Sequence, residues 1–182
     1  MNLYLRLLWL LLRLPFMRRH DVLQPSRLRL LVWPTDCDMN LHMNNGRYLT
    51  LMDLGRTQLV AQTGLLGIML KRRWAPVLAA AEINFVRPLA PFARFELVSR
   101  VATWDEKYFY MEQRFERGGV LHAVAYVRGV FLKGRTRIPT VQVVATLDPG
   151  LKAPPMPAAL RHWKDMGELK KRHTETHLNH VA

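Results

Sequence analysis

One long helical segment followed by four consecutive strand-type segments constrains the fold of this chain more than any other feature. Apolar residues recur at roughly helical spacing from Tyr48 to Val60, which predicts a helix of about 18 residues ending near Gly64. Segments rich in Val, Phe, Tyr and Ala then predict strands over residues 74–86, 92–103, 107–115 and 120–132. Because their connections are short, we expect neighbouring strands to pair as antiparallel meanders.

Shorter segments extend this pattern at both ends. A strand is predicted over residues 27–33, a second short helix over 66–72 and a further short strand over 141–146. A proline-rich linker, 152–157, precedes a surface helix over 158–172. An antiparallel sheet with one dominant helix is an α+β layout, in which the helix buries its apolar stripe against the sheet. The strand edges are long, so we expect a second copy of the chain to cover them in a homodimer.

The composition is that of a folded domain. The chain has 182 residues, of which 49% are hydrophobic, and this excludes a disordered protein. One domain takes roughly 100–200 residues, so the length fits one domain with short extensions. The single cysteine, Cys37, excludes an intrachain disulfide framework and a cysteine-based zinc site.

The chain is strongly basic, with 27 Lys and Arg against 14 Asp and Glu and a formal net charge of +13. Such a charge admits nucleic acid, an anionic membrane surface or an anionic metabolite as partner. The basic residues gather in the first twenty positions and in the clusters 71–73, 133–137 and 170–172. No helix-turn-helix, zinc-finger or RNP-type pattern accompanies them, so we expect no nucleic-acid partner.

The first 22 residues predict a basic, apolar helix. Arg6 and Arg13 interrupt the apolar run, so it is too short to span a bilayer, and no small-residue cleavage site follows it. The two arginines are seven positions apart and fall on nearly the same helix face. The helix either lies in a membrane interface, with both arginines at the phosphates and Trp9 at headgroup level, or packs on the body of the protein or a partner subunit. A cleaved signal peptide is a third alternative.

The segment between Asp36 and Tyr48 carries the residues with chemical function. It places two carboxylates, a histidine and two amides in a loop that runs into a helix N-terminus. Asn44 and Asn45 are good N-cap residues for that helix. Free backbone N–H groups at a helix start can bind an oxyanion or a polarised carbonyl, and a nearby carboxylate can act as nucleophile or base. These are the parts that acyl transfer needs.

On this segment the sequence resembles the hotdog-fold acyl-CoA thioesterases of the 4-hydroxybenzoyl-CoA thioesterase-like family. The family pattern is D-x-D-x-x-G-H-x-N-N-x-x-Y followed by an acidic residue and Arg, and here it stands as DCDMNLHMNNGRY followed by Asp53 and Arg56. The segment INFVRPL at 83–89 is similar to the family's strand-end signature, and the resemblance covers about residues 27–146. The linker, the pair His162-Trp163 and the apolar N-terminus further resemble the thioesterase-superfamily member 6 subgroup.

The resemblance implies a hotdog fold, in which an antiparallel sheet wraps one long helix, and a role for each matching residue. Asp38 would attack the thioester carbonyl or activate water, and the N–H of Asn45 would polarise the carbonyl oxygen. His42, Asn44 and Tyr48 would support them. Alternatives from the residues alone stay open: an Asx-turn for Asp38, loop stabilisation for His42 and Asn44, and packing for Tyr48. Leu41 stands where the family usually has Gly, so we expect a somewhat different backbone path there.

The implied substrate is an acyl-CoA, hydrolysed to free acid and CoA without a metal or a separate cofactor. Lys71, Arg72 and Arg73 are the predicted partners of the CoA phosphates, because Arg and Lys bind phosphate by charge and by hydrogen bonds. The acyl group would enter an apolar tunnel between helix and sheet. Candidate lining residues are Met52, Phe85 and Phe109.

The predicted organisation has an N-terminal helix over residues 1–22, a hotdog thioesterase domain over 27–146, and a linker with C-terminal helix and tail over 147–182. We expect a cytoplasmic protein that forms a homodimer or a tetramer. Peripheral membrane contact through residues 1–20 remains an alternative to a packed helix. Two other functions stay open: a non-catalytic lipid- or membrane-binding hotdog protein, and an acyl-thioester hydratase, which Asp38 and His42 in one loop suggest only superficially.

Overall fold

The computed structural model describes the backbone of residues 2–181 and the side chains of residues 3–173. Positions 1 and 182 of the predicted terminal segments lie outside these residues. The helices are α1 (Asn2–Arg13), α2 (Asn45–Gln62), α3 (Leu65–Arg72), α4 (Thr140–Ala145) and α5 (Ala158–Val181). The strands are β1 (Ser26–Leu31), β2 (Ala75–Phe85), β3 (Arg94–Trp104), β4 (Phe109–Arg117), β5 (Val120–Lys133) and β6 (Thr136–Ile138). The predicted long helix and the four predicted strands are therefore confirmed to within a few residues.

The strands form one antiparallel sheet in the order β1-β3-β4-β5-β2, with β6 paired to the end of β5. The predicted meander is confirmed for β3, β4 and β5, but β2 does not pair with its neighbour in sequence, β3. It pairs with β5 instead, in a register that runs from Ala75 opposite Leu132 to Phe85 opposite Ala123. The free edge of β3 is taken by β1, with Leu28 opposite Leu97. Short connections alone could not show that β1 occupies this edge.

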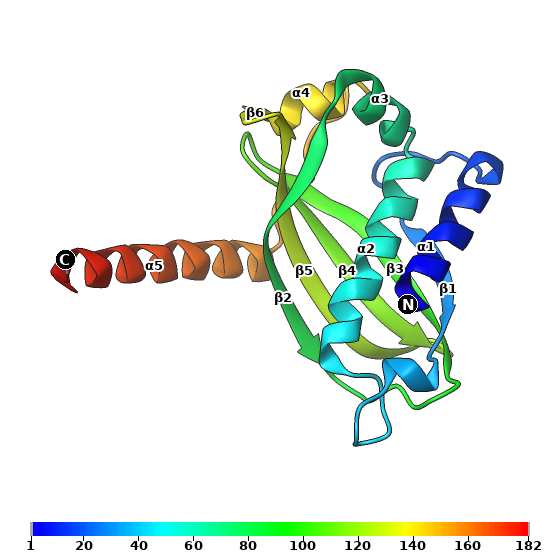
Figure 1. Cartoon of the computed structure of the whole chain (residues 1–182). Coiled ribbons are helices and arrows are strands. Elements are labelled where there is room, and N and C mark those ends of the chain that lie inside the picture. Colours follow the sequence, from blue (N-terminus) through cyan, green and yellow to red (C-terminus); the bar gives the residue numbers. More distant parts are fainter. Residues whose placement is uncertain (1, 182) are drawn as a thin grey trace.

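Helix α2 lies across the sheet, which curls around it (Figure 1). One side of the helix, including Leu51, Met52 and Leu59, is buried in the same core as Leu97 and Phe115 of the sheet. Gly55 allows this close approach, because a Cβ there would lie 2.6 Å from the Ser99 Oγ and 2.8 Å from a Leu97 methyl carbon. The predicted α+β layout, with one helix buried against an antiparallel sheet, is confirmed.

The prediction of a strand over residues 141–146 is wrong, because this segment forms helix α4. Val141, Val143 and Val144 favour a strand by propensity, but tertiary packing overrides this preference. Val143 and Val144 point together into the protein and are buried there, whereas Val141 is exposed. The strand of this region is β6, which pairs with β5 directly before α4.

The two terminal helices sit differently on the domain. Helix α1 packs beside α2 through Leu10, which is fully buried, whereas α5 extends away from the body (Figure 1). The start of α5 is anchored to the sheet: Leu160 is buried against Tyr110, and Lys164 pairs with Asp105 at 2.9 Å. Among the described residues, no helix is both long and apolar enough to cross a bilayer.

Candidate active site

The motif loop, residues 36–44, connects a 3₁₀ turn over Pro34–Asp36 with the start of α2. It is a tight ribbon closed by a bridge between Cys37 and Met43. Within it, the Asp38 N–H donates to the His42 carbonyl at 3.1 Å and the Leu41 N–H donates to the Asp38 carbonyl at 3.1 Å. These bonds fix Asp38 and His42 opposite one another at the tip of the ribbon.

Leu41 adopts the left-handed backbone conformation, with φ 55°. Glycine reaches this region without strain, but a residue with a Cβ does not. The position where the family usually has Gly thus keeps a conformation that favours Gly, although Leu stands there. Its side chain is 74% exposed, so no packing compensates for the strained backbone.

The Asp38 carboxylate accepts a hydrogen bond within the loop but remains accessible to solvent. Its Oδ1 accepts a hydrogen bond from the Asn40 N–H at 2.9 Å and lies 3.8 Å from the His42 Nδ1. The side chain is 26% exposed, and no described residue donates a hydrogen bond to its Oδ2. The Asx-turn considered from the sequence is therefore present, and it leaves one carboxylate oxygen available for chemistry.

The N-terminus of α2 follows directly on this loop. Asn44 is the N-cap, and its side-chain oxygen accepts a hydrogen bond from the Gly46 N–H at 2.9 Å. Asn45 is exposed, and its N–H has no acceptor among the residues that the structure describes. A first-turn N–H without a partner carries the positive end of the helix dipole, so this group can bind a carbonyl oxygen.

Tyr48 lies in the core beneath the loop. Its ring makes edge contacts with Phe85 and Phe115, at centroid distances of 5.0 and 4.8 Å. Burial raises the pKa of the Tyr48 phenol, and a hydrogen bond with the Leu89 backbone partly opposes this. The structure thus gives Tyr48 a packing role at the base of α2.

Asp36 supports the loop from below. Its side chain is fully buried, and it pairs with Arg6 of α1 at 2.5 Å and with Arg47 of α2 at 2.9 Å. It also accepts the Trp33 N–H at 2.9 Å. Burial lowers the pKa of the Arg6 guanidinium and the charge of Asp36 opposes this. The sequence does not reveal either arginine as a partner of Asp36, because a buried carboxylate demands cationic partners without indicating where in the chain they lie.

Cys37 is a poor nucleophile in this setting. Burial raises the pKa of its thiol, and the charges of Asp36 and Asp38 raise it further. A thiol that stays protonated at neutral pH does not attack a carbonyl readily.

The predicted phosphate-binding cluster does not meet the motif loop within one chain. Lys71 and Arg72 end α3 and Arg73 follows, so the cluster lies beyond the C-terminal end of α2, whereas Asp38 precedes its N-terminal end. A helix of this length spans about 27 Å. With Lys133 of the neighbouring hairpin, the cluster lines an open hollow of about 700 Å³, and the Arg72 guanidinium lies 4.9 Å from the centre of the Trp74 ring.

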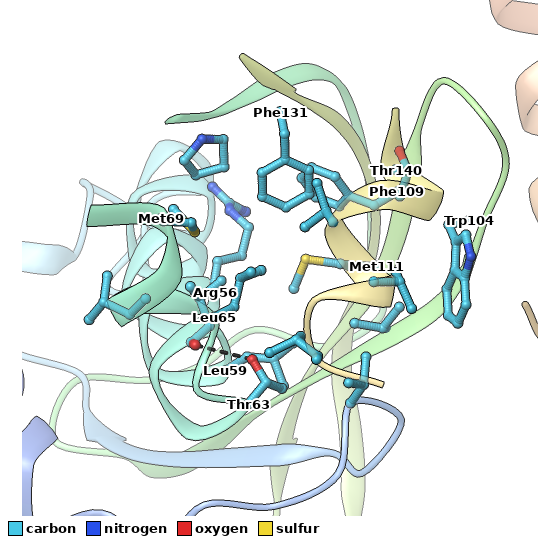
Figure 2. Close-up of a pocket in the computed structure, with 18 of the residues that line it drawn as sticks. Arg56, Leu59, Thr63, Leu65, Met69, Trp104, Phe109, Met111, Phe131 and Thr140 are labelled. Carbon is cyan, nitrogen blue, oxygen red and sulfur yellow. Dashed lines mark hydrogen bonds between the residues drawn. The ribbon is translucent and has the colours of Figure 1, made fainter. Parts of the chain in front are cut away.

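An apolar cavity of about 440 Å³ lies between the C-terminal half of α2, α3, α4 and the sheet (Figure 2). Its lining includes Leu59, Leu65, Met69, Phe109, Met111 and Phe131. Of the three residues expected to line an acyl tunnel, only Phe109 does so. Met52 is sealed in the core and Phe85 is exposed on β2. Among the side chains that the structure describes, no group of three or more His, Cys, Asp or Glu residues could hold a metal ion.

Comparison with known proteins identifies the family. A sequence model described as the Thioesterase-like superfamily matches residues 32–164. The chain belongs to this superfamily. The membership confirms the family predicted from the motif.

Individual relatives agree with this assignment. Protein THEM6 of Danio rerio is 37% identical over 134 residues, which are 72% of this chain and 66% of that protein. Protein THEM6 of Drosophila melanogaster is 29% identical over 157 residues, 85% of this chain and 79% of that protein. The resemblance to the member 6 subgroup is thus confirmed. The match covers just under two thirds of the zebrafish protein.

A solved structure supports the fold. The gentisyl-coenzyme A thioesterase BH1999 superposes with a TM-score of 0.57 over 64% of this chain and 96% of its own, at 19% sequence identity. The shared arrangement confirms the predicted hotdog fold.

Proposed function

We propose that this protein hydrolyses the thioester of an acyl-CoA to a free acid and CoA, with Asp38 as nucleophile or general base. One observation carries the proposal. The Asp38 carboxylate keeps an accessible oxygen in the motif loop. At the start of α2, directly after this loop, the Asn45 N–H has no acceptor among the described residues, and the chain belongs to the Thioesterase-like superfamily. The name of the similar gentisyl-coenzyme A thioesterase supports a CoA ester as substrate class.

The chemistry follows from these two groups. The Asn45 N–H donates to the thioester carbonyl oxygen and stabilises the negative charge that develops there. If Asp38 is the nucleophile, its oxygen bonds to the carbonyl carbon, the C–S bond breaks, and CoA leaves as a thiolate that takes a proton from solvent. Water then cleaves the mixed anhydride and restores the carboxylate. If Asp38 is the base, it takes a proton from the water that attacks the carbonyl.

The proposal includes a homodimer formed through β2. This strand is the end of the sheet, and both of its faces are largely exposed, including Val77, Leu78 and Phe85. Pairing with a second β2 would satisfy the backbone groups of that edge. A two-fold axis there sets the two α2 helices antiparallel, so the basic cluster of one chain comes near Asp38 of the other. Lys71, Arg72 and Arg73 would then bind the CoA phosphates in the partner's site.

Hydrolysis of an acyl-CoA panel tests the reaction and the substrate class together. Short-chain, medium-chain, long-chain and aromatic acyl-CoAs are incubated with pure protein, and the released thiol is measured. We expect at least one class to be hydrolysed, and Asp38→Asn to lower kcat by about 10²–10⁴-fold, the usual contribution of a positioned carboxylate. If no acyl-CoA is cleaved but the protein binds fatty acids, the alternative of a non-catalytic lipid-binding protein replaces this proposal.

A further inference from the structure

Helix α1 exposes an apolar face to solvent. Its inner side is used by Leu10, which is buried, and by Arg6, which reaches Asp36 beneath the motif loop. Its outer side carries large apolar residues at helical spacing, continued by a residue of the following turn: Tyr4, Leu5, Leu8, Trp9, Leu12 and Phe16. Leu12 is 66% exposed and Phe16 is 87% exposed. A contiguous exposed face of this kind marks a surface that meets another apolar phase.

The polar residues of α1 do not serve as expected from the sequence. In the membrane-interface alternative both Arg6 and Arg13 would reach phosphates, but the Arg6 side chain points inward and is only 10% exposed. Arg13 lies on the outside, where its guanidinium is 4.3 Å from the centre of the Trp9 ring. The helix therefore has one arginine that fixes it to the protein and one at the rim of the apolar face.

The end of α1 and the segment that follows it are positively charged. Arg13, Arg18 and Arg19 are exposed, and none of them has an ion pair among the residues that the structure describes. The first acidic residue of the sequence is Asp21. A second copy of the chain seated on this face would bring two such sets of arginines together, and like charges repel. A surface that is both apolar and anionic is the complementary partner.

We propose that the outer face of α1, together with Arg13 at its end and Arg18 and Arg19 after the following turn, binds the surface of a bilayer that contains anionic phospholipids. The leucines enter the acyl boundary, Trp9 lies at headgroup level and the arginines contact phosphates. Helix α1 has 12 residues, whereas a span needs about 20, so the helix lies along the interface. Its ion pair with Asp36 ties the helix to the motif loop, so the bound protein would keep Asp38 in a fixed orientation to the membrane.

Vesicle sedimentation tests this surface. Wild type is mixed with two kinds of vesicle. One contains phosphatidylcholine alone, and the other also contains about 30% phosphatidylglycerol, which gives the surface a negative charge. A first variant combines Leu5→Glu, Leu8→Glu and Leu12→Glu, and a second combines Arg13→Gln, Arg18→Gln and Arg19→Gln. A matched control combines Leu70→Glu, Val141→Glu and Leu169→Glu, which alter exposed apolar residues on α3, α4 and α5. Circular dichroism and thermal melting verify that all variants fold.

We expect wild type and the matched control to bind the anionic vesicles, with at least tenfold weaker binding to neutral vesicles. Each α1 variant should lose at least tenfold in affinity for the anionic vesicles. The proposal is overturned if wild type ignores both vesicles, if it binds them equally, or if the leucine variant binds like wild type. It is also overturned if wild type binds no vesicle but forms an oligomer that the leucine variant dissociates, because a second copy then covers the face. No outcome depends on hydrolysis, so the result is independent of the proposed function.

Discussion

The strained backbone of Leu41 shapes the turn that presents Asp38. A left-handed conformation costs a residue with a Cβ about 1–2 kcal/mol, and Leu41 has φ 55° with an exposed side chain. The carbonyl of Asp38 accepts the Leu41 N–H across this turn. The orientation of the candidate catalytic carboxylate thus depends on a backbone angle that glycine would adopt more easily.

Replacing this residue by glycine should stabilise the protein. Leu41→Gly removes the strain, while the greater freedom of glycine in the unfolded chain costs about 0.5–1 kcal/mol. We expect a net increase of about 0.5–1 kcal/mol in the free energy of unfolding, measured by urea denaturation. As a control, Leu49→Gly on the exposed side of α2 should lower it by about 1 kcal/mol. A loss of stability in Leu41→Gly would show that the turn is not strained.

Asp36 should matter for stability far more than Asp38. Removing one partner from a buried ion pair leaves the other charge uncompensated and costs about 3–5 kcal/mol. Asp36→Ala leaves Arg6 and Arg47 without their shared carboxylate, so we expect a loss of that size by urea denaturation. Asp38→Ala, which removes one local hydrogen bond, should cost about 1 kcal/mol. Similar losses in the two variants would contradict the assignment of Asp36 as the structural acid.

At the scale of elements, hydrophobic periodicity predicted the main helix and strands but not how they pair. The helix predicted to end near Gly64 ends at Gln62. The prediction is this close because α2 depends on local features, namely the spacing of its apolar residues and an Asn N-cap. The strand predicted over residues 141–146 failed because Val143 and Val144 are buried on one side of a short helix. The placement of β2 beside β5 depends on contacts between segments far apart in sequence, and no local pattern reports these.

In the candidate site, too, some residues could be predicted from the sequence and others could not. The sequence predicts Asp38, His42, Asn44 and Asn45 together because they lie close in sequence. The structure keeps the first three in one loop and places Asn45 at the start of α2. The role of Arg6 could not be predicted, because its partner Asp36 lies 30 positions away.

The attachment of α5 should weaken in acid. Burial alone would raise the pKa of Asp105, but hydrogen bonds from Lys164, the Tyr108 N–H, the Tyr110 hydroxyl and the Lys107 N–H hold it below its usual value. A carboxyl group whose pKa is lowered by folding contributes stability above its unfolded pKa of about 3.9 and loses this contribution as the pH falls through the folded pKa.

A pH series with Asp105→Asn tests this attachment. The variant should be less stable than wild type at pH 7, because the ion pair with Lys164 and the bonds to the carboxylate are lost or weakened. The difference in free energy of unfolding should shrink as the pH is lowered from about 5 toward 3, because wild type then loses the same charge. A difference that stays constant over this range would mean that the Asp105 charge does not stabilise the fold.

At the scale of the whole molecule, the structure shows where the residues behind the net charge of +13 lie. Some arginines are paired on the sheet, as in the contacts of Arg27 with Glu96 and of Arg100 with Glu112. Others gather around α1 and at the end of α3, at separate places on the molecule. This separation favours two anionic partners, a membrane surface for the first group and CoA phosphates for the second.

The β2 edge should control the oligomeric state. We expect wild type to have the mass of a dimer or a dimer of dimers by light scattering. Ala81→Glu should be a monomer, because Ala81 is exposed on this edge strand and a carboxylate there would have to be buried when two β2 strands pair. The monomer should also show a higher KM for acyl-CoA, since the basic cluster belongs to the partner's site. Val141→Glu on the exposed side of α4 is the control and should keep the wild-type mass. A monomeric wild type with full activity would contradict the shared site.

The most direct measurement compares kcat/KM for the best acyl-CoA among wild type, Asp38→Asn and Asp148→Asn. Asp148 is a matched control, because its Oδ1 accepts the Gly150 N–H at 2.9 Å, as that of Asp38 accepts the Asn40 N–H at 2.9 Å. We predict that Asp38→Asn lowers kcat/KM by about 10²–10⁴-fold while Asp148→Asn leaves it within about twofold of wild type, the range expected for an exposed surface change. Full activity of folded Asp38→Asn would contradict the assignment of Asp38 as the catalytic carboxylate.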